Sequence, residues 1–354
     1  MKSGLVCVGG LALSVALSTS AMAQTGGSSD HASDITGIWT NASLTPLTRP
    51  KGITDLVVSE SDAEKVIKAQ GGLLNNEDWK DKTYSDPNAP APEKGGADFG
   101  VIGYDSFWTS PGTSLARVKG ELRTSNIVDP PNGQIPYKDN GKILATQAER
   151  GRRYATGEHT YEGPEETGLP ERCLIGFGNT GGPGMLSILY NNTYQFVQTK
   201  DHLMILVEMA HDARIIPLFA DAATARASHK PDVIKPWLGT SVGWLEGATV
   251  VTETINVRPE QASYGPFWIS PTGKVIERYT RIKDDEIFYE FIVDDPELYT
   301  QTWKGELSFY PSTNVYEYAC HEGNYGLPGI LAGARAKEAE EAVTAKPVSK
   351  QTRS

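Results

Sequence analysis

Cysteine and basic residues are both scarce in this chain. Only three of its 354 residues are Cys, and 33 Lys and Arg stand against 44 Asp and Glu, giving a formal net charge of −11. This balance argues against nucleic acid as a partner, because a phosphate backbone is bound by a concentrated basic face. It argues equally against electrostatic docking on an anionic membrane. With 39% hydrophobic and 22% charged residues, the composition is that of a globular protein.

The sequence also lacks an apolar run long enough to span a membrane, and its first residues resemble a secretory signal peptide. Lys2 precedes an apolar stretch from Leu5 to Leu17, and Ala21-Met22-Ala23 forms a small-residue cleavage site. The stretch is short and interrupted by Ser and Gly, which disfavours the alternative of a retained anchor helix. We therefore expect cleavage after Ala23 and a periplasmic or secreted mature protein without a membrane span.

Export determines the redox environment of the remaining cysteines. Cys7 leaves with the signal peptide, so the mature chain holds Cys173 and Cys320. Two thiols in an oxidising compartment most simply form one disulfide, and we expect that bridge. The alternatives are two buried free thiols or one reactive cysteine. Neither residue belongs to a C-x-x-C motif, which disfavours thiol-exchange chemistry.

The chain divides into five regions by composition. We expect a signal peptide at 1–23, a disordered tail at 24–35, an N-terminal wrapping region at 36–165, a β domain with a C-terminal helix at 166–344 and a polar tail at 345–354. Helix formers and capping residues predict two short helices in the wrapping region and one at the C-terminal end, at 59–71, 140–155 and 327–343.

Strand patterns dominate the second half of the chain. Eight runs rich in β-branched and aromatic residues follow one another between short polar turns: TYQFVQ, HLMILVEM, ARIIPLF, VGWLEG, ATVVTETINV, KVIERYTRI, EIFYEFIVD and TWKGELSFY. Because no clear helix lies between them, a parallel β-α-β arrangement is disfavoured. The pattern predicts a mainly β fold, either an antiparallel barrel or a calycin-like, lipocalin-like sandwich.

Two glycine motifs suggest chemistry that their surroundings do not support. Residues 176–181 match the dinucleotide motif G-x-G-x-x-G, but Gly182-Pro183-Gly184 follows where a helix should begin. Residues 239–243 match the nucleophile motif G-x-S-x-G, but the sequence continues as a strand, which disfavours Ser241 as a nucleophile. We expect an irregular loop at the first motif and no cofactor.

Two histidines lie near predicted strand ends beside carboxylates. The first is His211, with Glu208 and Asp212 as neighbours, and the second is His321, followed by Glu322. An imidazole titrates near neutral pH and a carboxylate can orient it, so these five residues are the candidate catalytic groups. The alternatives are a plain hairpin turn and a helix cap. No H-x-x-x-H or H-E-x-x-H spacing is present, so we expect no metal.

Further polar and aromatic residues are candidates for substrate binding. If Cys173 joins Cys320, the loop at 176–184 and the second histidine lie together. In 274–282 neither strand face is purely apolar, which predicts that Arg278 or Arg281 points into a polar cavity; two solvated faces are the alternative. The full set of candidate binding residues is Tyr104, Asp105, Trp108, Tyr190, Asn192, Arg214, Arg278 and Tyr325.

Several long motifs together resemble a large family of secreted bacterial proteins of unassigned function. They include GIWTNASLTPLTRP (37–50), RTSNIVDPPNGQIPY (123–137), ERCLIGFGNTGGPGMLSILYNNTYQFVQT (171–199), VEMAHDARIIP (207–217) and YEYACHEGNYGLPGILAGARAKE (316–338). The resemblance covers nearly all of the mature chain and implies secretion and a single structural unit. The family pattern has acids where Thr240 and Ala248 stand and a Trp where Leu245 stands, so no role of that hairpin is carried over.

These observations favour a periplasmic or secreted enzyme that uses acid–base chemistry on a hydrophobic small molecule, aromatic or terpenoid in character. The reaction class would be lyase, hydratase or isomerase, because the dinucleotide motif and the nucleophile motif both lack the structural context that they need. His211 would be the general acid or base, oriented by Asp212 or Glu208, with His321 and Glu322 as the second pair. The alternatives are a lipocalin-like carrier for a hydrophobic ligand and a cell-envelope interaction module.

Overall fold

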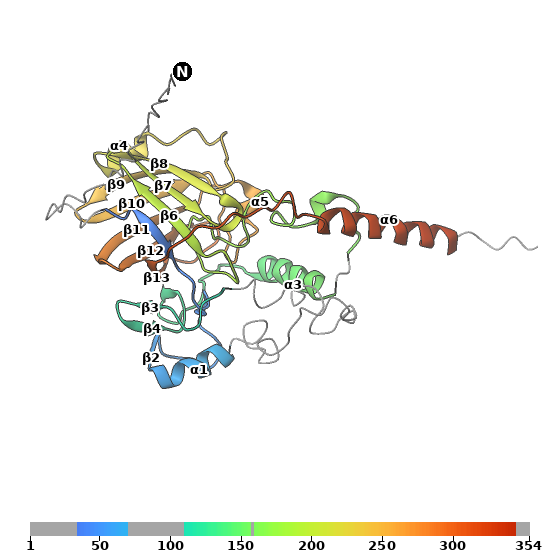
Figure 1. Ribbon diagram of the computed structural model, residues 1–354, viewed down its shortest axis with the longest axis horizontal. Coiled ribbons are helices and arrows are strands. Elements are labelled where there is room, and N and C mark those ends of the chain that lie inside the picture. The colour runs from blue at the N-terminus through green and yellow to red at the C-terminus, as the bar shows by residue number, and fades with distance from the viewer. Residues whose placement is uncertain (1–33, 70–109, 157–158, 345–354) are drawn as a thin grey trace, which may run out of the picture. The chain divides into compact units, whose positions relative to one another are not determined.

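Nine strands close into a β barrel (Figure 1). The computed structural model describes residues 34–69, 110–156 and 159–344. Around the wall the order is β1-β6-β7-β8-β9-β10-β11-β12-β13, and β13 pairs with β1 to complete the ring. This confirms the predicted mainly β fold. The strands are β1 (Gly37–Thr40), β6 (Thr193–Gln198), β7 (His202–Val207), β8 (Ala213–Phe219), β9 (Thr240–Glu246), β10 (Thr249–Ile255), β11 (Lys274–Lys283), β12 (Glu286–Asp294) and β13 (Trp303–Pro311).

The prediction of a strictly antiparallel barrel was wrong at one place. Strands β8 and β9 run parallel, with Leu218 opposite Gly243 and Phe219 opposite Trp244. A parallel pair needs a crossover connection, and here residues 220–239 provide it. They contain the short helix α4 (Ala222–Ala227), whose first turn is capped by the side chain of Asp221. The sequence allows a short helical turn at 219–236, and α4, six residues long, lies within that range.

The wall consists of two arcs joined by two narrow seams. The first arc is β1, β6, β7 and β8, and the second arc runs from β9 to β13. The seam between β8 and β9 and the seam between β13 and β1 each have two registered residue pairs. Within the arcs the pairing is far longer, for example along the whole of β11 and β12. Strand pairing is therefore more extensive within each arc than between the two arcs.

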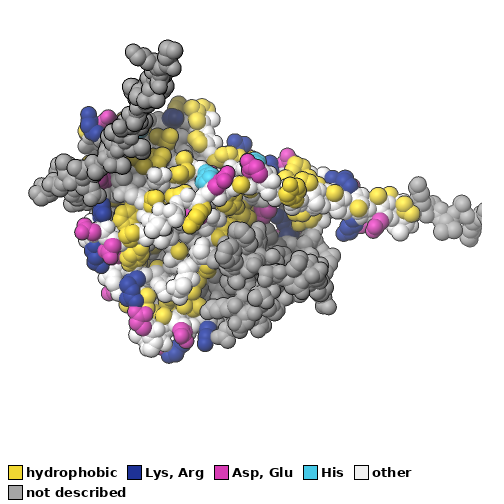
Figure 2. Space-filling model, viewed as in Figure 1, with side chains coloured by type: hydrophobic (Ala, Val, Ile, Leu, Met, Phe, Trp, Pro, Cys, Tyr) yellow, Lys and Arg dark blue, Asp and Glu magenta, His cyan; other side chains and the backbone are white. Residues whose placement is uncertain are grey.

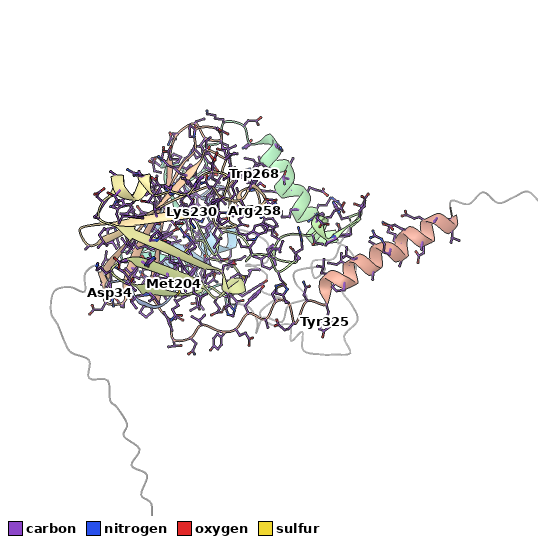
Figure 3. All side chains as sticks on the ribbon, turned by 90° about the horizontal axis from the view of Figure 1, so that it is seen from above. Asp34, Met204, Lys230, Arg258, Trp268 and Tyr325 are labelled. Atoms are coloured by element: carbon purple, nitrogen blue, oxygen red, sulfur yellow. A yellow bond between two sulfur atoms is a disulfide. The ribbon has the colours of Figure 1, made fainter. Side chains whose placement is uncertain are left out.

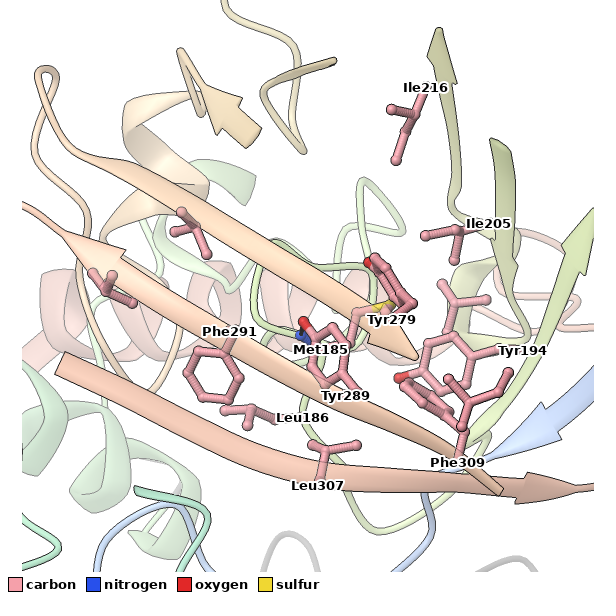
Figure 4. Close-up of a cluster of buried hydrophobic side chains, with 14 of the residues drawn as sticks. Met185, Leu186, Tyr194, Ile205, Ile216, Tyr279, Tyr289, Phe291, Leu307 and Phe309 are labelled. Atoms are coloured by element: carbon pink, nitrogen blue, oxygen red, sulfur yellow. Dashed lines mark hydrogen bonds between the residues drawn. The ribbon is translucent and has the colours of Figure 1, made fainter. Parts of the chain in front are cut away.

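Aromatic side chains fill the interior of the barrel (Figure 4). Inward positions alternate with outward ones along each strand, as the period of two requires. On β11, for example, Val275, Glu277 and Tyr279 are fully buried, whereas the residues between them are half-exposed. The rings of Tyr279 and Tyr289 lie 5.1 Å apart, and those of Tyr194 and Phe309 are equally close. Such a small barrel holds a packed core rather than a pore.

The remaining elements lie outside the ring. Strand β5 (Ile127–Asp129) pairs with β13, and β2 (Val57–Val58), β4 (Glu121–Arg123) and β3 (Arg117–Val118) form a small sheet. The helices are α1 (Glu60–Ala69), α3 (Gly141–Thr156), α5 (Pro259–Ala262) and α6 (Gly326–Thr344), with 3-10 turns at Pro164–Glu166 and Met209–His211. No described helix is long and apolar enough to cross a membrane. The predicted wrapping region also supplies a barrel strand, β1.

A disulfide joins the turn that contains Cys173 to the segment that leads into α6. The sulfur atoms of Cys173 and Cys320 lie 1.98 Å apart and their Cα atoms 5.8 Å apart, which confirms the predicted bridge. Helix α6 itself has no buried residue. Tyr325, just before the helix, is 83% exposed (Figure 3). The predicted signal peptide and cleavage site lie outside the described residues.

Candidate functional site

The glycine-rich segment at residues 176–186, hereafter the plug, enters the barrel. Its residues from Asn179 to Leu186 are buried. The backbone N–H of Gly184 donates to Glu277 Oε1 at 3.2 Å, and that of Met185 donates to Tyr289 Oη at 2.9 Å. The hydroxyl of Tyr194 donates to the carbonyl of Thr180 at 2.9 Å. Three interior side chains from three strands thus fix the plug, and Met185 lies among the core rings (Figure 4).

The glycines of the plug are explained by close packing rather than by nucleotide binding. Gly182 has φ +83°, and a Cβ there would lie 2.5 Å from Arg214 Nη1. Gly184 has φ +74°, and its Cβ would lie 2.9 Å from Phe267 Cζ. Only glycine combines this backbone conformation with so little space. The segment is the irregular loop that the sequence predicts, but it lies within the barrel.

A buried ion pair forms the polar centre of the interior. Arg214 Nη1 lies 3.1 Å from Glu277 Oε1, and Arg214 Nη2 also bonds to the Glu277 carboxylate. Arg214 Nη2 donates further to Thr254 at 3.0 Å and Ser241 at 3.2 Å, and the Tyr289 hydroxyl donates to Glu277 at 2.7 Å. Burial acts to raise the pKa of Glu277, but the charge and hydrogen bonds of Arg214 hold it below its ordinary value. So many donors fix this carboxylate in its ionised form.

Glu277 and Tyr289 were missed by sequence reasoning, and Arg278 was chosen in their place. The prediction was that Arg278 or Arg281 points into the interior; Arg278 does not, because it lies on the outer face with Nη1 2.8 Å from Glu246 Oε2. Arg281 donates to the carbonyl of Asp34. The strand period places Glu277 on the inward row instead, between two large buried side chains. An acid between Val275 and Tyr279 on this row was the available signal.

The turn between β7 and β8 carries three of the predicted catalytic residues, but the hydrogen-bond partners of these residues are not the expected ones. Glu208 is buried and accepts from Asn191 Nδ2 at 2.6 Å and from the N–H of Tyr316 at 3.2 Å. His211 Nε2 lies 3.0 Å from the Tyr316 carbonyl and 3.2 Å from the N–H of Tyr318. Glu208 and His211 therefore hold the backbone of the segment before Cys320. This corrects the expectation that Glu208 orients the imidazole.

Asp212 differs from its neighbours because its side chain faces the plug. Its Oδ2 accepts the N–H of Gly176 at 2.8 Å, so it too is engaged away from His211. A Cβ at Gly181 would lie 3.1 Å from Leu238 and 3.5 Å from the Cβ of Asp212, which places both side chains against the plug. Burial raises the pKa of Asp212 to about 6, although the Gly176 N–H and the charge of His211 act to lower it. The side chain is half-buried, so it keeps contact with solvent.

The other predicted residues have mixed positions. Asn192 folds the chain after the plug, with Oδ1 accepting from the Ile188 N–H at 2.8 Å, and the Tyr190 ring packs edge-on against Phe177 at 6.3 Å. His321 and Glu322 are exposed in the turn after Cys320. Tyr104, Asp105 and Trp108 lie outside the described residues. Of the predicted residues, Tyr190, Asp212 and Arg214 contact the plug, whereas His321 and Glu322, expected beside it, are exposed and Arg278 lies on the outer face.

Neither a metal centre nor a known relative adds to this site. Within residues 34–69, 110–156 and 159–344, no group of three or more His, Cys, Asp and Glu side chains could hold a metal ion. No family model, curated protein or solved structure matches the chain. Function is therefore inferred from the residues around the plug.

Proposed function

We propose that this chain is a periplasmic or secreted enzyme that transfers protons to or from a hydrophobic small molecule, with Asp212 as the acid–base group. The reaction class is lyase, hydratase or isomerase. The observation that carries the proposal is the half-buried Asp212 carboxyl beside the plug, with a pKa of about 6. A group that ionises near the working pH can both accept and donate a proton. The disulfide is compatible with the oxidising location.

The neighbouring residues have supporting parts in this proposal. The Gly176 N–H holds the carboxyl in one position, and the Arg214–Glu277 pair fixes the plug to which Gly176 belongs. Next to the plug, Leu169, Ile175 and Leu238 form a buried cluster, with Trp237 and Tyr264 partly buried against it. The half-exposed rings of Trp237 and Tyr264 are the part of this cluster that a hydrophobic substrate would contact. His211 holds the segment at 316–318 and is therefore replaced by Asp212 as the acid–base residue.

The carrier alternative receives less support from the geometry. A lipocalin-like carrier needs space inside its barrel, whereas Phe196, Tyr279 and Tyr289 are fully buried against one another and the plug adds Met185. A ligand could enter only by displacing the plug and breaking its bonds to Glu277 and Tyr289. The acid–base site lies beside the plug and requires no such displacement.

Deuterium transfer tests the proposal across several substrate classes at once. The mature protein is incubated in D2O with a panel of hydrophobic alkenes, ketones and alcohols, and mass spectrometry follows carbon-bound deuterium and added or lost water. We expect turnover of at least one class, reduced by about a hundredfold or more in Asp212→Asn. Arg278→Gln, on the outer face, is the matched control and should keep full activity. Equal turnover by wild type and Asp212→Asn would contradict the assignment, as would a panel without any reaction.

A further inference from the structure

The crossover from β8 to β9, residues 220–239, is exposed for much of its length after α4. The helix itself packs through the buried Ala225 against the outer side of β9 and β10. From Lys230 to Ile234 every residue is exposed, Val233 to 84%. Figure 3 labels Lys230 in this part, and Figure 2 shows hydrophobic side chains uncovered near α4. This part of the chain buries little apolar surface, so polar contacts have to hold it on the barrel.

A buried carboxylate on the barrel wall supplies such contacts at the end of α4. Glu253 lies on the outer side of β10, because Thr252 and Thr254 on either side of it bond to the ion pair in the interior. His229 Nε2 lies 3.4 Å from Glu253 Oε1, and Arg226 Nε lies 3.0 Å from Glu253 Oε2. The side chain of Glu253 is 5% exposed, that of His229 10% and that of Arg226 49%. One carboxylate thus holds two basic residues of the crossover.

The contact between His229 and Glu253 is an ion pair only while the imidazole is protonated. Both ring nitrogens of His229 are buried, and within the described residues neither has a hydrogen-bond partner. A neutral ring in this position is therefore buried with its nitrogens unsatisfied, which is unfavourable. A protonated ring gains the attraction of a carboxylate oxygen 3.4 Å away. The strength of this contact thus depends on one proton.

The other charges near the pair do not replace His229 as the titrating group. Contact with His229 holds the pKa of Glu253 below its ordinary value against the effect of burial, and Arg226 and Lys274 add to this. Glu253 is therefore ionised wherever imidazoles titrate, between about pH 5 and 8. Arg226 repels a protonated ring, but water screens its half-exposed charge. Lys274 of β11 is paired with Asp294 at 3.3 Å. The charged residues that follow in the crossover, Lys230 and Asp232, are exposed.

We infer that His229 is a pH switch that holds the crossover on the barrel wall when protonated and releases it when neutral. The ion pair exists only while the crossover lies on the wall, so protonation favours the closed form and rising pH weakens it. The inference does not depend on the proposed function, since His229 and Glu253 lie outside the residues assigned to acid–base chemistry.

The released part would lie between α4 and Pro236. The N–H of Arg258 holds the Pro236 carbonyl at 3.0 Å and so fixes the far end of this part. Between these points a neutral hydrogen bond, from Asn256 Nδ2 to the Lys230 carbonyl at 3.2 Å, continues to act, so release is local and reversible. Trp237 follows directly and belongs to the apolar cluster beside the plug. An effect of release on catalysis would rest on the proposed function.

Hydrogen exchange followed by mass spectrometry tests the inference on the mature protein. The reporting amides are those of Ser228, His229 and Ile234, which donate to carbonyls within the crossover. From about pH 5.5 to about pH 8, their exchange relative to the intrinsic chemical rate should rise about tenfold or more in the wild type. The hairpin of β11 and β12 should change little. His229→Gln should exchange fast at both pH values, whereas the matched control His202→Gln, at an exposed histidine of β7, should respond like the wild type.

Three results would overturn the inference. The first is wild-type exchange that is independent of pH after this correction, and the second is an unchanged pH response in His229→Gln. The third is exchange that slows as the pH rises, which would mean that the neutral ring holds the crossover.

Two further measurements separate His229 from other causes. A nuclear magnetic resonance titration of the His229 ring needs no variant; its midpoint should coincide with that of the exchange, and separate midpoints would contradict the inference. The pH response should persist in Asp212→Asn, and its loss there would assign the response to Asp212 instead. Deuterium transfer to a substrate is measured independently, so the switch and the proposed function can fail separately.

Discussion

Arg214 of β8 and Glu277 of β11 meet inside the barrel, with Nη1 3.1 Å from Oε1 and both side chains buried. One residue belongs to the first arc of the wall and the other to the second arc. Because the seam between β8 and β9 has only two registered pairs, the ion pair adds an interior link between the arcs. The same carboxylate accepts the N–H of Gly184, so this one contact also anchors the plug.

Breaking this pair should strongly destabilise the fold. Glu277→Leu leaves the Arg214 guanidinium buried without its counter-charge, and we expect a loss of about 3–5 kcal/mol in the free energy of unfolding. The double variant Arg214→Met with Glu277→Leu should be more stable than Glu277→Leu alone, because it buries no unpaired charge. Urea unfolding at neutral pH measures both. A single variant within about 1 kcal/mol of the wild type would show that the pair contributes little.

Asp212 should make the protein less stable as the pH rises. Its pKa is about 6 when folded and near 3.8 otherwise, so between these values the folded state keeps a proton that the unfolded state releases. Stability is then highest below this window and is reduced above pH 6. Asp212→Asn should remove the effect and gain about 1–2 kcal/mol at pH 7.5, with little change at pH 4. Urea unfolding at both pH values checks this, with the exposed Asp284→Asn as control; parallel pH curves for wild type and Asp212→Asn would refute it.

The plug should tolerate alanine far less well than an open turn does. Gly182 and Gly247 both have positive φ, +83° and +61°, but only at Gly182 does a Cβ meet another atom, Arg214 Nη1 at 2.5 Å. Gly247→Ala should therefore cost about 1 kcal/mol for the backbone conformation alone. Gly182→Ala should cost about 1–3 kcal/mol more, because the ion pair must shift. Thermal or urea unfolding of the two variants decides this, and equal losses would count against a tightly packed plug.

The disulfide should protect the segment before α6. Alkylation without reductant should leave Cys173 and Cys320 unmodified in the mature protein. Cys320→Ser should lower the free energy of unfolding by about 2–5 kcal/mol, since the bridge closes a span of 147 positions. Limited proteolysis should then cut first within 312–325, which Glu208, His211 and Asn324 still hold by hydrogen bonds. Free thiols in the native protein, or unchanged proteolysis of Cys320→Ser, would contradict these expectations.

Regular elements were more predictable from the sequence than the contacts between them. The bounds of β6, β8 and β12 agree with the runs TYQFVQ, ARIIPLF and EIFYEFIVD, because period-two patterns between polar turns are local signals. The burial of Glu277 was not predictable in this way, since it depends on a guanidinium 63 positions away. The burial of the plug inside the barrel also depends on residues that are distant in the sequence. Its glycines are necessary because Arg214 and Phe267 approach them, and the local sequence signals neither approach.

The contacts of the candidate site were only partly predictable. The expected disulfide forms between Cys173 and Cys320, but His321 and Glu322 beside it are exposed. Proximity in the chain suggested that His211 and Asp212 act on each other, but the imidazole meets the backbone of Tyr316 and the carboxylate meets that of Gly176. Both partners are backbone groups, which any residue type could supply. Side-chain patterns alone therefore could not identify them.

The parallel seam between β8 and β9 follows from arithmetic as well as from local sequence. A closed ring whose members alternate in direction must have an even number of members. The barrel wall has nine strands, so one neighbouring pair has to run in the same direction, and among the described strands β8 and β9 are that pair. Gaining or losing a single strand would restore an even ring. The crossover through α4, between Phe219 and Thr240, is therefore needed because the number of barrel strands is odd. A barrel of eight or ten strands could replace it with a tight hairpin.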